Sequence, residues 1–62
     1  MTVNIAERRK EKGLTVRKIA ELVGITQGGY THIELGHRNP SVSTAKKIAN
    51  ILDFDWTEFF PD

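Results

Sequence analysis

The chain has 62 residues, a formal net charge of +1 and no cysteine, which excludes disulfides and thiolate metal sites. No apolar run approaches the roughly 18 to 20 residues that a membrane span needs, and residues 1–15 lack the apolar stretch of a secretion signal. We therefore expect residues 1–62 to form one small cytoplasmic domain.

The first predicted helix lies near the N-terminus. Asn4, followed three residues later by Glu7, has the form of a capping pair, which predicts a helix from Ile5 toward Lys12. Gly13 is expected to end this helix, because glycine is a common residue just past a helix terminus.

Two more short helices are predicted to follow. Thr15 is a candidate N-cap for a helix whose apolar residues recur at helical spacing, namely Val16, Ile19, Ala20 and Val23. Gly24 stands where a left-handed residue ends such a helix. Thr26 is expected to cap a third helix over residues 27–35, which Gly36 ends in the same way.

The rest of the chain predicts one longer helix and a short terminal piece. Pro40 and Ser41 mark a turn, after which a fourth helix is indicated by the apolar stripe of Val42, Ala45, Ile48, Ala49 and Leu52. Asp55 is expected to cap a last turn or two in the aromatic segment 55–60, which Pro61 closes. No stretch alternates with period two for long enough to be a strand, so the sequence predicts an all-α fold.

The basic residues are concentrated ahead of most of the acidic ones. Residues 8–47 carry all nine Lys and Arg against three glutamates, whereas residues 48–62 carry four carboxylates and no Lys or Arg. A basic body is suited to neutralising the phosphates of DNA, with the acidic tail pointing elsewhere. An ordinary solvated surface accounts for the same pattern, so charge alone leaves both interpretations open.

The strongest functional signal lies in residues 16–35, VRKIAELVGITQGGYTHIEL. Ala20 is small enough for two helix axes to approach closely, and Gly24 can adopt the positive φ of a sharp turn. With Ile25 anchoring the turn, three connecting residues suffice to redirect the chain. The segment therefore predicts a helix-turn-helix motif, whose second helix has an outward side made of Gln27, Gly28, Thr31 and His32.

This outward side is short, polar and uncharged, which suits the edges of DNA bases. Glutamine pairs with adenine N6 and N7, threonine offers a hydroxyl or a methyl group, and histidine donates or accepts according to its protonation. A polar helix face that is merely solvated is the competing interpretation.

Nearly the whole chain resembles the Cro and phage-repressor (XRE-type) helix-turn-helix family. The resemblance is carried by four separated blocks in the same order: IAERRKEKGLT, IAELVGIT, IELGHRNPS and AKKIANIL. It implies a compact five-helix, lambda-repressor-like domain that binds double-stranded operator DNA, commonly as a dimer, and represses transcription. No cofactor, metal or small-molecule ligand is implied.

The resemblance also implies roles for individual residues. Arg9 is expected to pair with Glu34 and brace the first helix against the end of the third, while Thr26 faces a phosphate. The base-reading positions match Gln27, Gly28 and His32, and more weakly Thr31. The loop residues expected to touch the DNA backbone are His37, Arg38 and Asn39.

Two features depart from the family pattern. Val16 stands where the family commonly has a phosphate-contacting glutamine, so Arg17 is the candidate to compensate. Gly28 and Gly29 each cost on the order of 1 kcal/mol relative to alanine in a helix. Either the backbone approaches DNA or a partner very closely there, or the first turn is loose until binding orders it.

The aromatic tail offers a surface for self-association. Trp56, Phe59 and Phe60 are the candidates for a dimer interface, because aromatic clusters dominate such surfaces. The alternative is that these three residues only cap the core.

Catalysis is not expected from this chain. His32 and His37 lie five residues apart, which does not bring them to one helix face, and neither has an obvious carboxylate or cysteine companion for a zinc site. The competing function is a protein-interaction module of the same fold, such as an antitoxin or anti-repressor. Salt dependence separates the two, because DNA binding weakens steeply as salt rises.

Overall fold

The computed structural model describes residues 4–60, so the prediction for Pro61 lies outside the described residues. These residues form four α-helices, α1 (Ile5–Glu11), α2 (Val16–Val23), α3 (Gln27–Glu34) and α4 (Val42–Leu52), followed by a 3-10 turn, η1 (Trp56–Phe59). No strand occurs within residues 4–60, and the all-α prediction is confirmed.

The expected fifth helix is a single turn. Asp55 caps it by accepting a hydrogen bond from the Thr57 N–H at 3.0 Å. The backbone bonds that follow span three residues rather than four, from the Glu58 N–H to the Asp55 carbonyl and from the Phe60 N–H to the Thr57 carbonyl, both at 3.0 Å. This is the 3-10 pattern of a short terminal turn, so the prediction of five helices is corrected to four and one turn.

The four α-helices begin where the sequence predicted. At each start a side-chain oxygen accepts a hydrogen bond from the backbone N–H three residues on, at 3.0 to 3.2 Å; the capping residues are Asn4, Thr15, Thr26 and Ser41. These bonds satisfy amide groups that have no partner inside the helix.

The turn between α2 and α3 is sharp because of one glycine. Gly24 has a φ of +88°, and the N–H groups of Gly24 and Ile25 both donate to the Ala20 carbonyl, at 2.8 and 3.0 Å. A residue with a Cβ is strained at this φ, whereas glycine is not. Three residues therefore redirect the chain from α2 into α3, as the motif requires.

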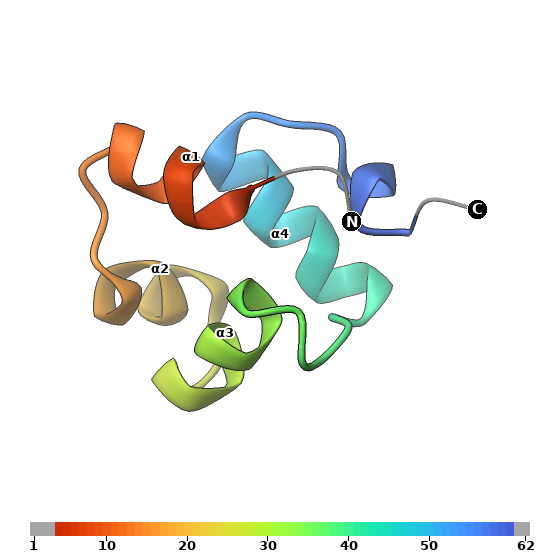
Figure 1. The fold of residues 1–62 in the computed structure, drawn as a ribbon, viewed down its shortest axis with the longest axis horizontal. Coiled ribbons are helices and arrows are strands. Elements are labelled where there is room, and N and C mark those ends of the chain that lie inside the picture. The colour runs from red at the N-terminus through yellow and green to blue at the C-terminus, as the bar shows by residue number, and fades with distance from the viewer. Residues whose placement is uncertain (1–3, 61–62) are drawn as a thin grey trace.

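A single apolar core holds the elements together. Buried side chains come from every element: Ile5, Ile19, Ala20, Val23, Tyr30, Ile33, Ala45, Ile48, Leu52 and Phe59. α2 packs on α3 and α4, while α1 and η1 pack on α4, so α4 connects the two ends of the fold (Figure 1). The small side chain of Ala20, which is 1% exposed, lies in the core of the α2–α3 unit.

Candidate nucleic-acid interface

The outward face of α3 carries the four residues predicted to read bases. Gln27, Gly28, Thr31 and His32 are all exposed, while the opposite side of the helix is anchored in the core by Tyr30 and Ile33. The helical spacing thus separates a polar face from an apolar one within eight residues.

The C-terminal end of α3 brings the two histidines together. Gly36, at a φ of +80°, turns the chain back, and the His37 N–H donates to the His32 carbonyl at 2.9 Å. The Gly36 N–H donates to the Ile33 carbonyl at 3.1 Å, which completes a glycine-dependent helix stop. The imidazole centroids consequently lie 5.9 Å apart. The turn at Gly36 brings the two histidines together, and helical periodicity does not. Their spacing of five residues therefore did not reveal the pair.

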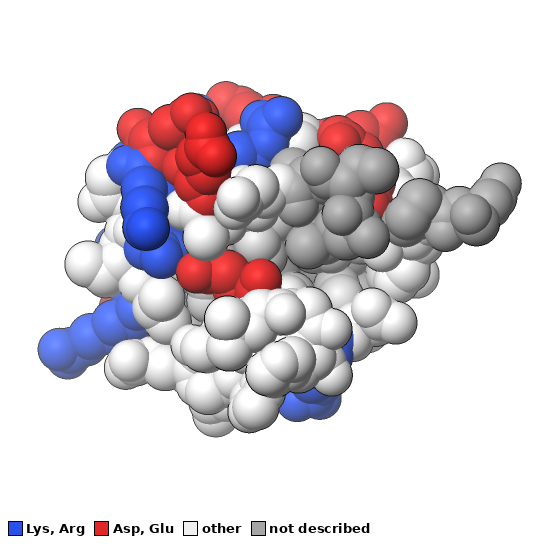
Figure 2. Space-filling view, in the orientation of Figure 1, with Lys and Arg blue, Asp and Glu red and all other residues white. Residues whose placement is uncertain are grey.

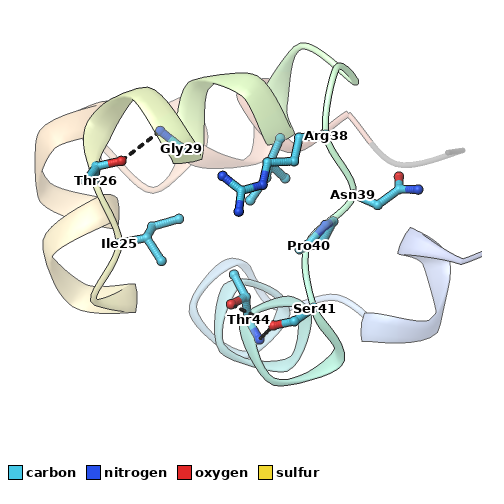
Figure 3. Close-up of a pocket in the computed structure, with 9 residues that line it drawn as sticks. Ile25, Thr26, Gly29, Arg38, Asn39, Pro40, Ser41 and Thr44 are labelled. Atoms are coloured by element: carbon cyan, nitrogen blue, oxygen red, sulfur yellow. Dashed lines mark hydrogen bonds between the residues drawn. The ribbon is translucent and has the colours of Figure 1, made fainter.

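A cavity of about 300 Å³ opens between the starts of α3 and α4. In Figure 3 the Arg38 side chain reaches into the space between these helices, whereas the Asn39 side chain points away from it. The polar lining also includes the capping residues Thr26 and Ser41, together with Thr44. A guanidinium beside two helix N-termini is an arrangement that favours an anion such as a phosphate.

Two of these lining residues were not among the predicted site residues. Ser41 was recognised only as part of a turn, and Thr44 was not singled out. The sequence did contain a signal for them. Ser41 stands three positions before Thr44, which is the pattern of a helix N-cap, and it is close in sequence to Arg38.

The start of α2 lacks the polar side chain that the family commonly has there, as the sequence predicted. Val16 is partly buried and packs against the core, so its side chain faces the protein and offers no polar group to a phosphate. Arg17, the next residue, is exposed.

Several of the cations counted in the sequence are engaged within the molecule. The Lys12 Nζ lies 2.7 Å from an Asp53 carboxylate oxygen, and an Arg8 guanidinium nitrogen donates to the Asp53 carbonyl at 3.3 Å. The Lys46 Nζ lies 5.1 Å from the centroid of the Trp56 ring. The acidic tail therefore does not simply point away from the basic body, because Asp53 contacts Arg8 of α1 and Lys12 just after that helix.

The surface over α3 is, by contrast, largely uncharged. Figure 2 shows mixed acidic and basic side chains gathered over α1, and a mostly white surface over α3 with an acidic group at its border toward α1 and basic groups beyond its other edges. Arg17 is exposed near the start of α2, and Arg38 is exposed in the middle of the loop between α3 and α4. An uncharged face with cations at its edges is the pattern expected of a surface that meets bases in its centre and phosphates at its rim.

Arg9 braces the end of α3 against α1, as the family resemblance implied. Its Nε and Nη2 donate to the two carboxylate oxygens of Glu34 at 3.0 and 3.2 Å, and its Nη1 donates to the Leu14 carbonyl at 2.8 Å. The two side chains are only 12% and 13% exposed. A two-pronged contact of this kind sets the orientation of the helix as well as its position.

The core residue beside this pair is kept neutral. The hydroxyl of Tyr30 is buried and has no hydrogen-bond partner within residues 4–60. Burial, reinforced by the neighbouring Glu34 carboxylate, raises the pKa of Tyr30 far above its usual range. Tyr30 is neutral at every physiological pH, as an unperturbed tyrosine also is, and its fully buried ring anchors α3 in the core.

The ion pair predicts a loss of stability in acid. Burial is the largest single influence and raises the pKa of Glu34, but the hydrogen bonds and positive charge of Arg9, with smaller effects from the neighbouring Tyr30 and Lys10, together outweigh burial and hold that pKa below its ordinary value. The resulting stabilisation is fully present above the pKa of an unfolded glutamate, about 4.3, and is lost as the pH falls through the lower pKa of the folded state.

Urea unfolding at neutral pH and at about pH 3 measures this loss. The wild type should lose more stability between the two conditions than the variant Arg9→Met/Glu34→Leu, which lacks the pair. Equal losses in the two proteins would show that other carboxylates carry the acid sensitivity.

The aromatic tail divides between the core and the surface. Phe59 is 5% exposed and belongs to the core, which corrects its assignment to a dimer interface, because η1 folds back onto α4. Phe60 is 37% exposed, and its ring meets the partly buried Trp56 edge-on at 6.1 Å between centroids. Trp56 and Phe60 remain as candidates for contact with a partner.

Two further observations bear on the class of protein. None of the helices within residues 4–60 has the length and apolar character needed to cross a membrane. In the same part of the chain, no three His, Asp or Glu side chains are grouped so that they hold a metal ion.

Comparison with known proteins agrees with this geometry. A family model described as Helix-turn-helix, HTH_3, matches residues 5–59. YqaF of Bacillus subtilis, an uncharacterized HTH-type transcriptional regulator, is 47% identical over 58 residues, covering 94% of this chain and 76% of that protein. PuuR of Escherichia coli, an HTH-type transcriptional regulator, is 33% identical over 58 residues, covering 94% of this chain and 31% of that protein.

A solved structure shares the fold. The crystal structure of an HTH_3 family transcriptional regulator from Vibrio cholerae matches with a TM-score of 0.72 and 32% sequence identity, over 92% of this chain and 32% of that one. This chain thus spans about a third of the length of that protein and of PuuR. The resemblance inferred from the sequence is confirmed, and the chain belongs to the helix-turn-helix family HTH_3, a non-enzymatic class of DNA-binding transcriptional regulators.

Proposed function

We propose that this chain is a cytoplasmic transcriptional repressor that recognises a specific double-stranded operator and binds it as a homodimer. The observation that carries the proposal is the exposed, uncharged polar face of α3, formed by Gln27, Gly28, Thr31 and His32. A helix with such a face fits the major groove, where each base pair presents a distinct pattern of donors, acceptors and methyl groups.

The surroundings of α3 support contacts with the DNA backbone. Arg38 and Thr26 border the cavity at the start of α3, and Arg17 is exposed at the start of α2. His37 and Asn39 are exposed in the loop after α3. Contacts from these five residues to phosphates fix the register of the helix, and the face of α3 then supplies the specificity.

The test is a salt titration of duplex binding. Duplexes that the protein selects from a random pool are labelled, and their affinity is measured by fluorescence anisotropy between about 50 and 200 mM salt. A DNA-reading function predicts a linear and steep fall of the logarithm of the affinity with the logarithm of the salt concentration. Absence of binding to any duplex at low salt would refute the proposal.

The second candidate function is a protein-interaction module of the same fold. It is favoured by two leucines, Leu22 and Leu35, which are 52% and 62% exposed. Apolar contact through such side chains is insensitive to salt, so a flat titration with a protein ligand and no affinity for DNA would favour this function.

Arg38 provides a prediction for the phosphate contacts. Arg38→Ala should weaken binding to the operator and to random duplex by similar factors and reduce the salt slope by about 1, because one released counterion is lost. Lys12→Ala is the control, since it removes the same charge just after the end of α1, where the ammonium already contacts Asp53. A change in base preference in Arg38→Ala would contradict a phosphate role.

The homodimer is supported by the aromatic pair of Trp56 and Phe60, which leaves part of its surface exposed at the end of the chain. In a two-fold dimer the two α3 helices face half-sites about 34 to 36 Å apart, which is one turn of DNA. A duplex with both half-sites should therefore bind more tightly than one with a single half-site. Equal affinities, together with a monomer in sedimentation equilibrium, would argue against the dimer.

A further inference from the structure

Two neighbouring glycines, Gly28 and Gly29, lie in the first turn of α3. Neither has a positive φ, so neither supplies a backbone conformation that other residues reject. Glycine weakens a helix relative to alanine, because it loses more backbone freedom on folding. Each of the two positions therefore needs its own explanation.

Gly29 has an explanation inside the protein. A Cβ at this position would lie 3.0 Å from the Thr26 Oγ1 and 3.9 Å from an Arg38 guanidinium nitrogen. The same Thr26 oxygen accepts the hydrogen bond from the Gly29 N–H that caps α3. A methyl group would crowd the cap, so the absence of a side chain at position 29 protects the start of the helix.

Gly28 has no such explanation. A Cβ built on it meets no heavy atom within 4 Å, and the residue is exposed. Alanine fits at this position without any rearrangement and stabilises the helix. The space above Gly28 is therefore left open by the chain without any gain to its own fold.

We propose that Gly28 is a notch that admits the methyl group of a thymine to the backbone of α3, an inference that rests on the proposed function. On a helix the neighbours of position 28 on the same face are positions 31 and 32, so the exposed Thr31 and His32 border the notch, and Gln27 precedes it. The notch has no side-chain donor or acceptor of its own, and it therefore selects by shape.

The chemistry of the major groove identifies the occupant. Besides hydrogen-bonding nitrogen and oxygen atoms and small C–H groups, its base edges carry the C5-methyl group of thymine, which is the apolar group that projects furthest from the edge. A methyl on Gly28 occupies the same volume as a thymine methyl that approaches the backbone closely. The alanine methyl at position 28 and the thymine methyl therefore exclude each other. The interface has room for either one, but not for both.

The loose-turn explanation of Gly28 makes the opposite prediction for binding. If glycine served to keep the first turn disordered in the free protein, Gly28→Ala would order that turn in advance and raise the affinity for DNA. If Gly28 is a notch, Gly28→Ala lowers the affinity. The sign of the effect separates the two explanations.

The first measurement is thermal unfolding of Gly28→Ala and Gly29→Ala, which differ only in the position of the added methyl. Gly28→Ala is expected to raise the melting temperature by about 4 to 8 °C, and Gly29→Ala is expected not to raise it. A stabilised Gly28→Ala also ensures that any loss of binding does not come from misfolding.

The second measurement is a methyl exchange across the interface. On the selected operator, Gly28→Ala should bind about tenfold more weakly than the wild type. Replacing each thymine in turn by uracil deletes one methyl, and at one position this should weaken the wild type about fourfold. On the operator with uracil at that position, Gly28→Ala and the wild type should bind with about the same affinity.

The outcomes distinguish this inference from the function on which it rests. If the wild type binds no duplex, both the proposed function and the notch are refuted. Wild-type protein that binds its operator, with Gly28→Ala binding equally or more tightly, removes only the notch. Loss of affinity in Gly28→Ala that no uracil substitution relieves also overturns the notch for thymine.

Discussion

Arg9→Met is expected to lower the free energy of unfolding by about 2 to 3 kcal/mol at neutral pH, a large share of the roughly 3 to 9 kcal/mol typical of a chain this long. The variant leaves the Glu34 carboxylate, only 13% exposed, without its cation, and it leaves the Leu14 carbonyl without its donor. The cost arises mainly from this uncompensated charge, because the pair itself gains little net energy over its desolvation. The expected loss lies at or just below the lower end of the range of about 3 to 5 kcal/mol for buried pairs, because Arg9 and Glu34 keep some contact with solvent.

The control variants make this prediction specific. Arg9→Met/Glu34→Leu removes both charges, and it should recover most of the stability that Arg9→Met loses. Lys12→Met breaks the ion pair with Asp53, whose side chains are 42% and 76% exposed, and it should change the urea midpoint only slightly. Similar losses for Arg9→Met and Lys12→Met, or no recovery in the double variant, would contradict a desolvated brace.

Gln27→Ala is expected to weaken operator binding by about 1 to 3 kcal/mol, or roughly 5- to 150-fold. Gln27 is the first residue of α3 and is fully outside the core, so its removal should leave the melting temperature nearly unchanged. The loss should be confined to the operator, because random duplex is held by phosphate contacts that do not include this side chain.

Base-pair substitutions in the operator locate the contact. Gln27→Ala should show no preference at one base pair where the wild type prefers adenine, and Gln27→Glu should shift the preference there toward cytosine, whose N4 group is a donor. Equal weakening on operator and random duplex would exclude base reading by Gln27.

Local features of this fold were predictable from the sequence. The caps at Asn4, Thr15 and Thr26 and the stop at Gly24 depend on hydrogen bonds within four residues, so a short window of sequence contains the whole interaction. The face of α3 was predictable for the same reason, because helical spacing alone assigns Tyr30 to the core and its neighbours to the outside.

Features that depend on where distant segments meet were not predictable. The contact of Lys12 with Asp53 joins residues 41 positions apart, and no local pattern announces it. Phe59 and Phe60 are adjacent and chemically identical, and only the direction of η1 against α4 decides which one is buried. The histidine pair depends on the left-handed residue Gly36, whose effect lies outside helical periodicity.

Because α3 is short, a ligand that binds its polar face also stabilises the folded protein. A helix of eight residues does not persist alone in water, so its polar face exists only while Tyr30 and Ile33 are held in the core. Unfolded chains therefore present no such face, and under the proposed function the operator is a ligand of the native state alone. Each tenfold excess of free operator over its dissociation constant then shifts the unfolding equilibrium by about 1.4 kcal/mol toward the native protein, without any change inside the molecule.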